Sequence, residues 1–84
     1  MIIEVDIVTL EVRVNGRKVG TTTTEKMHAM RDFSRKYCKP KANSTYYTNL
    51  GGKIASQHDI PDDVAERLVE FFAKKIEKFL LDDK

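Results

Sequence analysis

The residues best suited to chemistry are basic side chains in the middle of the chain, accompanied by tyrosines. The stretch RDFSRKYCKPKANSTYYTNLGGK covers residues 31–53 and contains four aromatic residues and a double glycine. At about 100° per residue, a helix here places His28, Arg31, Arg35 and Lys39 within an arc of roughly 80°. Guanidinium and ammonium groups neutralise phosphates, and a tyrosine ring stacks on an unpaired base. The pattern predicts a face for nucleic acid or for an acidic partner.

This candidate basic face extends from the helix to the turn before it and the loop after it. Its members are Arg17, Lys18, Arg31, Arg35, Lys36, Lys39, Lys41, Tyr46 and Tyr47. The alternative interpretation is a solvated helix surface, in which Asp32 pairs with Lys36 one turn later. Outward helix surfaces are usually charged and polar, so the sequence leaves both interpretations open.

Other chemistry has little support in the sequence. His28, Cys38 and His58 occur singly, without CxxC or HxxxH spacing, so no metal site is predicted. Cys38 falls at the edge of the apolar arc of its helix and is predicted to be a small core residue. The NLGGK stretch lacks the glycine spacing of a phosphate-binding loop and predicts a turn. We therefore expect no catalysis, no cofactor, no metal and no small-molecule substrate.

The composition bounds the kind of protein that carries these residues. The chain has 84 residues, of which 40% are hydrophobic and 33% charged, as expected for one small globular domain over residues 1–84. Its apolar runs are too short to cross a membrane. The start, MIIEVDIVTL, has acidic residues where a signal peptide is apolar, and Cys38 is the only cysteine. These features predict a cytoplasmic protein without membrane contact.

Charge is distributed unevenly along the chain, although the net charge is only +2. Residues 1–12 hold three acidic side chains and no base, residues 13–53 hold ten bases against two acids, and residues 54–84 hold five bases against eight acids. A basic middle between acidic ends steers encounters with charged partners more than the total charge does.

The N-terminal residues predict an antiparallel β-hairpin. Apolar and polar residues alternate from Val8 to Val14, and Asn15-Gly16 follows as a strong turn signal. The predicted pairs are Val14 with Arg17, Val12 with Val19 and Leu10 with Thr21. The apolar residues from Ile3 to Ile7 have the opposite parity, which predicts a bulge or a break between two strands near Ile7.

The sequence TTTTEK predicts the start of a first helix, with Thr22 or Thr24 as its N-cap. Pro40 predicts that this helix ends by Lys39, because proline neither continues a helix nor favours one in the residue before it.

Residues 45–56 have two interpretations, which the sequence leaves open. One is a second short hairpin, with strands at 46–50 and 53–56 joined by Gly51 and Gly52. The other is an irregular loop, because the alternation of apolar and polar residues is untidy here.

The C-terminal sequence predicts a long amphipathic helix that begins near Pro61 and runs to about Leu81. Its apolar positions cover an arc of roughly 200°, about twice what packing on one sheet requires. We infer that this helix buries a second side, against the first helix or against a second copy of the chain. Lys75 interrupts the arc and is predicted to snorkel at its rim or to pair with an acid. The predicted interface residues are Phe71, Lys75, Phe79 and Leu80.

Together these elements predict an α+β fold, in which both helices pack on one face of a small antiparallel sheet. The favoured function is a small non-enzymatic binding protein that acts through protein–protein contacts, as a homodimer, an adaptor or an inhibitor of a larger partner. The alternative is a nucleic-acid-binding accessory or regulatory protein that uses the basic face of residues 17–41.

Overall fold

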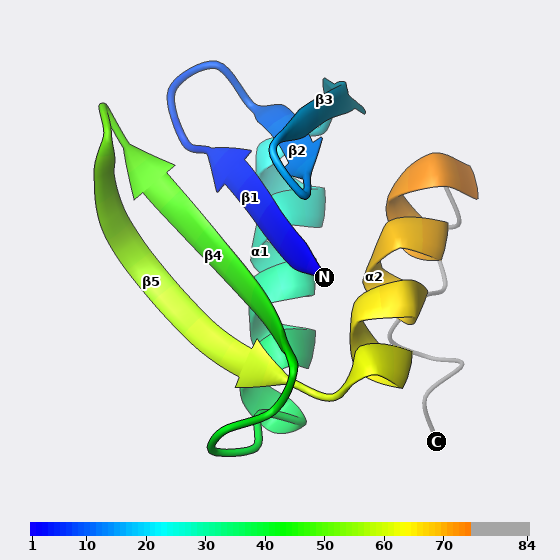
Figure 1. The fold of residues 1–84 in the computed structure, drawn as a ribbon. Coiled ribbons are helices and arrows are strands. Elements are labelled where there is room, and N and C mark those ends of the chain that lie inside the picture. Colours follow the sequence, from blue (N-terminus) through cyan, green and yellow to red (C-terminus); the bar gives the residue numbers. More distant parts are fainter. Residues whose placement is uncertain (75–84) are drawn as a thin grey trace.

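In the computed structural model, which describes residues 1–74, a five-stranded sheet carries two helices (Figure 1). In chain order the elements are β1 (Ile2–Asp6), β2 (Glu11–Val14), β3 (Arg17–Thr21), α1 (Thr24–Lys36), β4 (Ser44–Leu50), β5 (Lys53–Ile60) and α2 (Asp62–Lys74). The predicted α+β class is confirmed.

The sheet is mixed, which corrects the prediction of an antiparallel sheet. Its strand order is β3-β2-β1-β4-β5, and β1 runs parallel to β4, whereas the other neighbouring pairs are antiparallel. The chain leaves β1, forms β2, β3 and α1, and then returns beside β1 in the same direction (Figure 1). Parallel neighbours need such a crossover connection, and α1 supplies it here.

Asp6 ends β1 and shapes the loop that follows it. Its carboxylate accepts hydrogen bonds from the amides of Val8 and Thr9 at 2.8 and 3.0 Å, and its carbonyl accepts one from Leu10 at 2.7 Å. Leu10 takes a positive φ of 63°. This loop is a break between two strands, one of the two outcomes that the change of parity near Ile7 predicts.

The turn between β2 and β3 lies at Asn15 and Gly16, whose φ values of 53° and 83° fit a type I′ turn. The pairs are Val14 with Arg17, as predicted, but Val12 with Gly20 and Glu11 with Thr21. A bulge in β3 leaves Val19 without an opposite residue, which shifts the register by one. The hydrophobic pattern alone does not reveal a single inserted residue in an edge strand.

Thr23 caps α1, because its side chain accepts a hydrogen bond from the Lys26 amide at 3.1 Å. The predicted caps, Thr22 and Thr24, flank it, since four consecutive threonines offer the same hydroxyl group. The helix ends at Lys36, before Lys39 and Pro40, as predicted.

Strands β4 and β5 pair across Gly51 and Gly52, which take φ values of 60° and 92°. Residues 45–56 therefore form parts of two strands and the turn between them rather than an irregular loop. A second bulge leaves Ala55 in β5 without an opposite residue.

One face of the sheet is covered by both helices and the other face is open. Ile3, Val5, Val12 and Tyr46 are at most 1% exposed and point to the covered side. The helices contribute Met27, Met30, Phe33, Val64, Ala65, Leu68 and Phe71 to the same core. Because side chains alternate along a strand, the residues between the buried ones lie on the open side.

The described part of α2 ends at Lys74, so the predicted continuation to Leu81 lies outside the described residues. The same holds for Lys75, Phe79 and Leu80, three of the four predicted interface residues. The fourth, Phe71, is 5% exposed and packs in the core of its own chain. It therefore has little surface left for a partner.

Candidate functional site

Tyr46 lies in the core, which corrects its place on the candidate basic face. Its side chain has no exposed surface, and its hydroxyl donates a hydrogen bond to the Met27 carbonyl at 3.1 Å. Burial raises the pKa of Tyr46, and the positive charge of Arg31 acts against this effect. The ring is thus unavailable for stacking on a base.

Tyr47 points to the opposite side of β4, onto the open face of the sheet. Burial raises the pKa of its phenol, and the adjacent Glu4 adds to this effect through its negative charge and a hydrogen bond. The carboxylate of Glu4 also accepts a hydrogen bond from the side-chain amide of Asn49. The half-buried Tyr47 therefore belongs to a polar network on the open face.

Lys18 lies on this open face as well, away from the helices. Its Nζ is 3.4 Å from a carboxylate oxygen of Glu11, and Nη2 of Arg13 is 3.3 Å from the other oxygen. Val12, between Glu11 and Arg13, points into the core, so its two neighbours point to the open side. The sheet therefore separates Lys18 from the basic residues of α1, and the structure does not bring residues 17–41 into one face.

Asp32 lies among the basic residues of α1. Its Oδ1 accepts hydrogen bonds from Nε and Nη2 of Arg31 at 3.4 and 3.2 Å and from Nη2 of Arg35 at 2.9 Å. Burial acts to raise the pKa of Asp32, but these hydrogen bonds and the two positive charges hold it below its usual value. Part of the positive charge of this surface is thus compensated within the helix.

The rest of the predicted basic residues near α1 are exposed. Lys36 lies with its Nζ 5.4 Å from the centre of the Tyr37 ring, and Lys39 and Lys41 follow the helix in an exposed loop. Arg17 is exposed at the start of β3. Lys36, Lys39 and Lys41 give the outer surface of α1 and the following loop a positive charge, without Tyr46 or Tyr47 beside them.

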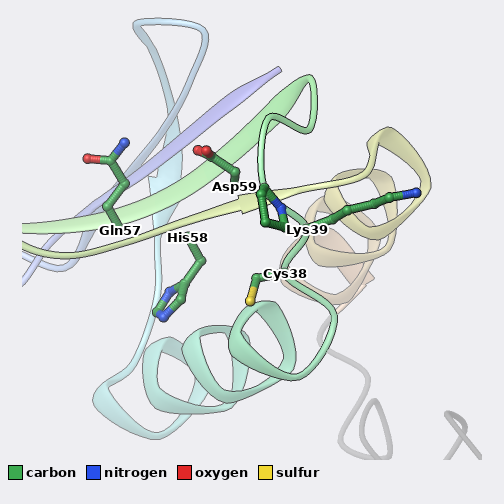
Figure 2. A pocket seen from close by; sticks show the side chains of 6 residues that line it. Cys38, Lys39, Gln57, His58 and Asp59 are labelled. Carbon is green, nitrogen blue, oxygen red and sulfur yellow. The ribbon is translucent and has the colours of Figure 1, made fainter.

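A small hollow separates the C-terminal end of α1 from β5 (Figure 2). Its volume is about 200 Å³, and the Cys38 sulfur and the His58 ring lie on the same side of β5, whereas Asp59 points to the other side. Cys38 is exposed, so its prediction as a core residue is wrong. Nδ1 of His58 is buried without a hydrogen-bond partner among the described residues. Cys38 and His58 supply two metal ligands, fewer than a metal centre needs. Residues 1–74 contain no group of three His, Cys, Asp or Glu side chains that could hold a metal ion.

Three exposed apolar side chains mark one end of the sheet, where β1, β4 and β5 meet the connecting turns. Val8 is 67%, Leu50 54% and Ile54 58% exposed, and we name these three residues the apolar tip. Ile54 lies opposite Asn49, and the Asn49 carbonyl accepts a hydrogen bond from the Ile7 amide at 2.8 Å. The loop that carries Val8 is therefore attached to the end of β4 that precedes the β4–β5 turn.

The residues of the apolar tip are not among the predicted interface residues, although the sequence contains a signal for two of them. Leu50 and Ile54 flank Gly51-Gly52-Lys53, and an apolar residue at the end of a short hairpin has no helix to cover it. Their proximity to Val8 depends on the parallel pairing of β1 with β4, which the local pattern does not contain.

The described elements define the class of this protein as a small α+β protein with a mixed five-stranded sheet and helices on one face. No protein-family model, no curated protein and no solved structure matches the chain. Neither described helix has the length and apolar character that a bilayer span requires.

Proposed function

We propose that this protein functions through protein–protein contact, and that its primary contact is a homodimer formed through the apolar tip. The observation that supports the proposal is that Val8, Leu50 and Ile54 all lie at one end of the sheet, each more than half exposed. Single exposed apolar residues are ordinary, but neighbouring ones mark contact surfaces.

The apolar tip is well ordered by its surroundings, which favours binding. The carboxylate of Asp6 holds the amides of Val8 and Thr9 at 2.8 and 3.0 Å, and paired strands fix Leu50 and Ile54. A surface that is already in its bound conformation loses less entropy on association.

The edges of the sheet are less suited to a partner strand. Both edge strands, β3 and β5, carry a bulge, which interrupts the regular row of backbone groups. The amide of Lys39 also donates a hydrogen bond to the Asp59 carbonyl at 2.9 Å and so occupies one end of the β5 edge.

A second copy of the chain fits the charges around the apolar tip. Exposed Lys53 lies on the β5 side, and Asp6 lies on the β1 side, with Leu50 between them. A two-fold axis through Leu50 exchanges the two sides, because a two-fold interface places the same patch on both copies. Lys53 of one copy then faces Asp6 of the other, and Val8 faces Ile54.

The test is sedimentation equilibrium across the micromolar range with three single variants. Wild type should associate reversibly, and Leu50→Asp or Ile54→Asp should weaken association by at least about tenfold, because each buries an unpaired charge. Val19→Asp is the matched control, since Val19 is 47% exposed on β3 and the charge change is the same. A wild type that stays monomeric at every concentration, or equal losses in all three variants, would overturn the proposal.

Nucleic-acid binding, the alternative expected from the sequence, has less support from the geometry. Tyr46 is buried, Lys18 lies across the sheet from α1, and Asp32 binds two of the arginines. A positive surface remains on α1 and the following loop, but neither tyrosine predicted for base stacking lies beside it, because Tyr46 is buried and Tyr47 lies on the open face.

A further inference from the structure

A hollow lies on the covered side of the sheet, between the first half of α1 and the ends of β4 and β5 that adjoin their connecting turn. Its volume is about 160 Å³. The polar side chains that line it are His28, Arg31, Thr48 and Ser56, and Ile7 and Met27 form apolar walls. A liquid water molecule occupies about 30 Å³, so the hollow has room for a small polyatomic ion.

Arg31 supplies the positive charge of this hollow. The guanidinium has five N–H donors, and the hydrogen bonds from Nε and Nη2 to Asp32, at 3.4 and 3.2 Å, use two of them. Both distances are long for a charge-assisted bond. The remaining donors are therefore open to a stronger acceptor, and His28 adds a ring N–H at the exposed side.

Thr48 and Ser56 add a hydroxyl donor at the inner side. Their oxygens are 2.7 Å apart, so one hydroxyl donates to the other. The second hydroxyl hydrogen is not used in that bond, and Thr48 is only 4% exposed. A buried hydroxyl group is stabilised by any acceptor that reaches it.

We propose that this hollow binds a phosphate group. A tetrahedral oxyanion has oxygens in several directions, so it accepts from the Arg31 fork on one side and from the Thr48–Ser56 hydroxyls on another. A carboxylate has only two oxygens, which lie in one plane, so it spans donors on two sides of the hollow less well. The apolar walls of Ile7 and Met27 exclude water from one side and strengthen these hydrogen bonds.

The phosphate site does not depend on the proposed dimer, because no residue that lines the hollow belongs to the apolar tip. The phosphate group has two sources with the same chemistry, a free inorganic ion or a phosphate monoester. Titrations with sodium phosphate and with phosphoserine distinguish them, because only a monoester site binds the second at least as well as the first.

The experiment follows backbone amide signals by two-dimensional NMR while sodium phosphate replaces sodium chloride at constant ionic strength. We expect saturable shifts centred on Thr48, Ser56 and Arg31. Arg31→Gln should weaken phosphate binding by about tenfold or more, because it removes a charge-assisted bond. Arg35→Gln is the matched control, since Arg35 shares Asp32 with Arg31 but does not line the hollow.

Two further variants keep the proposal falsifiable if Arg31→Gln does not fold. Asp32→Asn should strengthen phosphate binding, because it removes the carboxylate that competes for Arg31. Ser56→Ala should weaken binding by about threefold to tenfold, the effect of one neutral hydrogen bond. Absence of saturable shifts in wild type, or equal losses in Arg31→Gln and Arg35→Gln, would show that phosphate meets only a diffuse positive surface and would overturn the proposal.

Discussion

Tyr46 and Tyr47 are consecutive residues with opposite surroundings, and their chemistry follows from the side of β4 on which each lies. Tyr46 is fully buried and donates to the Met27 carbonyl, whereas Tyr47 is half-buried beside Glu4 on the open face. Burial raises the pKa of both phenols, and Glu4 contributes further at Tyr47. The predicted basic face contains both tyrosines, because two adjacent tyrosines in a sequence do not reveal which one points into the core.

The raised pKa of Tyr46 predicts a loss of stability at high pH. The folded state holds the proton more tightly than the unfolded state, in which the pKa is about 10. This contribution to stability is present below about pH 10 and is lost as pH rises toward the folded-state pKa, because the unfolded state then binds fewer protons. We expect the urea midpoint of wild type to fall steeply above about pH 10.

Tyr46→Phe tests this prediction. At neutral pH the variant should lose about 1 kcal/mol, because the Met27 carbonyl loses a buried hydrogen bond. Above about pH 10 it should lose less additional stability than wild type, because one proton-linked group is gone. Tyr47→Phe controls for the half-exposed phenol and should keep most of the wild-type pH dependence. Equal pH dependence in wild type and Tyr46→Phe would contradict the assignment.

At the scale of elements, local signals located the helices and turns but not their details. The threonine run, Pro40, Asn15-Gly16 and Gly51-Gly52 act through backbone rules that hold within a few residues. The bulges at Val19 and Ala55 depend on what packs against an edge strand, so the alternation of residues does not show them. The N-cap was displaced by one residue because four threonines are locally equivalent.

The β3 bulge brings Gly20 against α2, and this contact predicts a strict requirement for glycine. Gly20 has a φ of 155°, and a Cβ built there lies 2.9 Å from Cζ of Phe72. Gly20→Ala should cost about 2–4 kcal/mol, from backbone strain and displacement of the ring. Gly52→Ala is the control, because Gly52 has a φ of 92° with no atom within 4 Å, and it should cost about 1–2 kcal/mol.

A double variant separates the two causes. If the ring contact matters, Gly20→Ala should be less costly in a Phe72→Leu background by at least about 0.5 kcal/mol, measured by urea unfolding. Strict additivity of the two substitutions would assign the whole loss of stability in Gly20→Ala to backbone strain. The contact of residue 20 with Phe72 would then contribute nothing to that loss.

The arrangement of the whole molecule was the least predictable level. The pairing of β1 with β4 joins residues about 43 positions apart, such as Ile2 with Thr45 and Ile3 with Tyr46. No periodicity in the sequence reports which strands become neighbours, so the predicted sheet held only antiparallel pairs. The same pairing brings Val8 beside the β4–β5 turn, and the sheet it completes separates Lys18 from α1. Both the apolar tip and the division of the basic face are therefore consequences of topology.

Because β1 lies between β2 and β4, the β2–β3 pair on one side of β1 and the β4–β5 pair on the other should unfold together. Ile3 has no exposed surface and lies opposite Val14 on one side and Tyr46 on the other. Ile3→Ala should cost about 2–5 kcal/mol, since it opens a cavity that both neighbours line. NMR signals of β3 and β5, followed in urea, should lose intensity at one common and lower midpoint. Val19→Ala, at a 47% exposed position of β3, should leave the free energy of unfolding within about 0.5 kcal/mol of wild type. If Ile3→Ala lowered the midpoint of the β3 signals and left the β5 signals at the wild-type midpoint, the β4–β5 pair would unfold as an independent unit. The parallel pairing of β1 with β4 would then not make the sheet one cooperative structure.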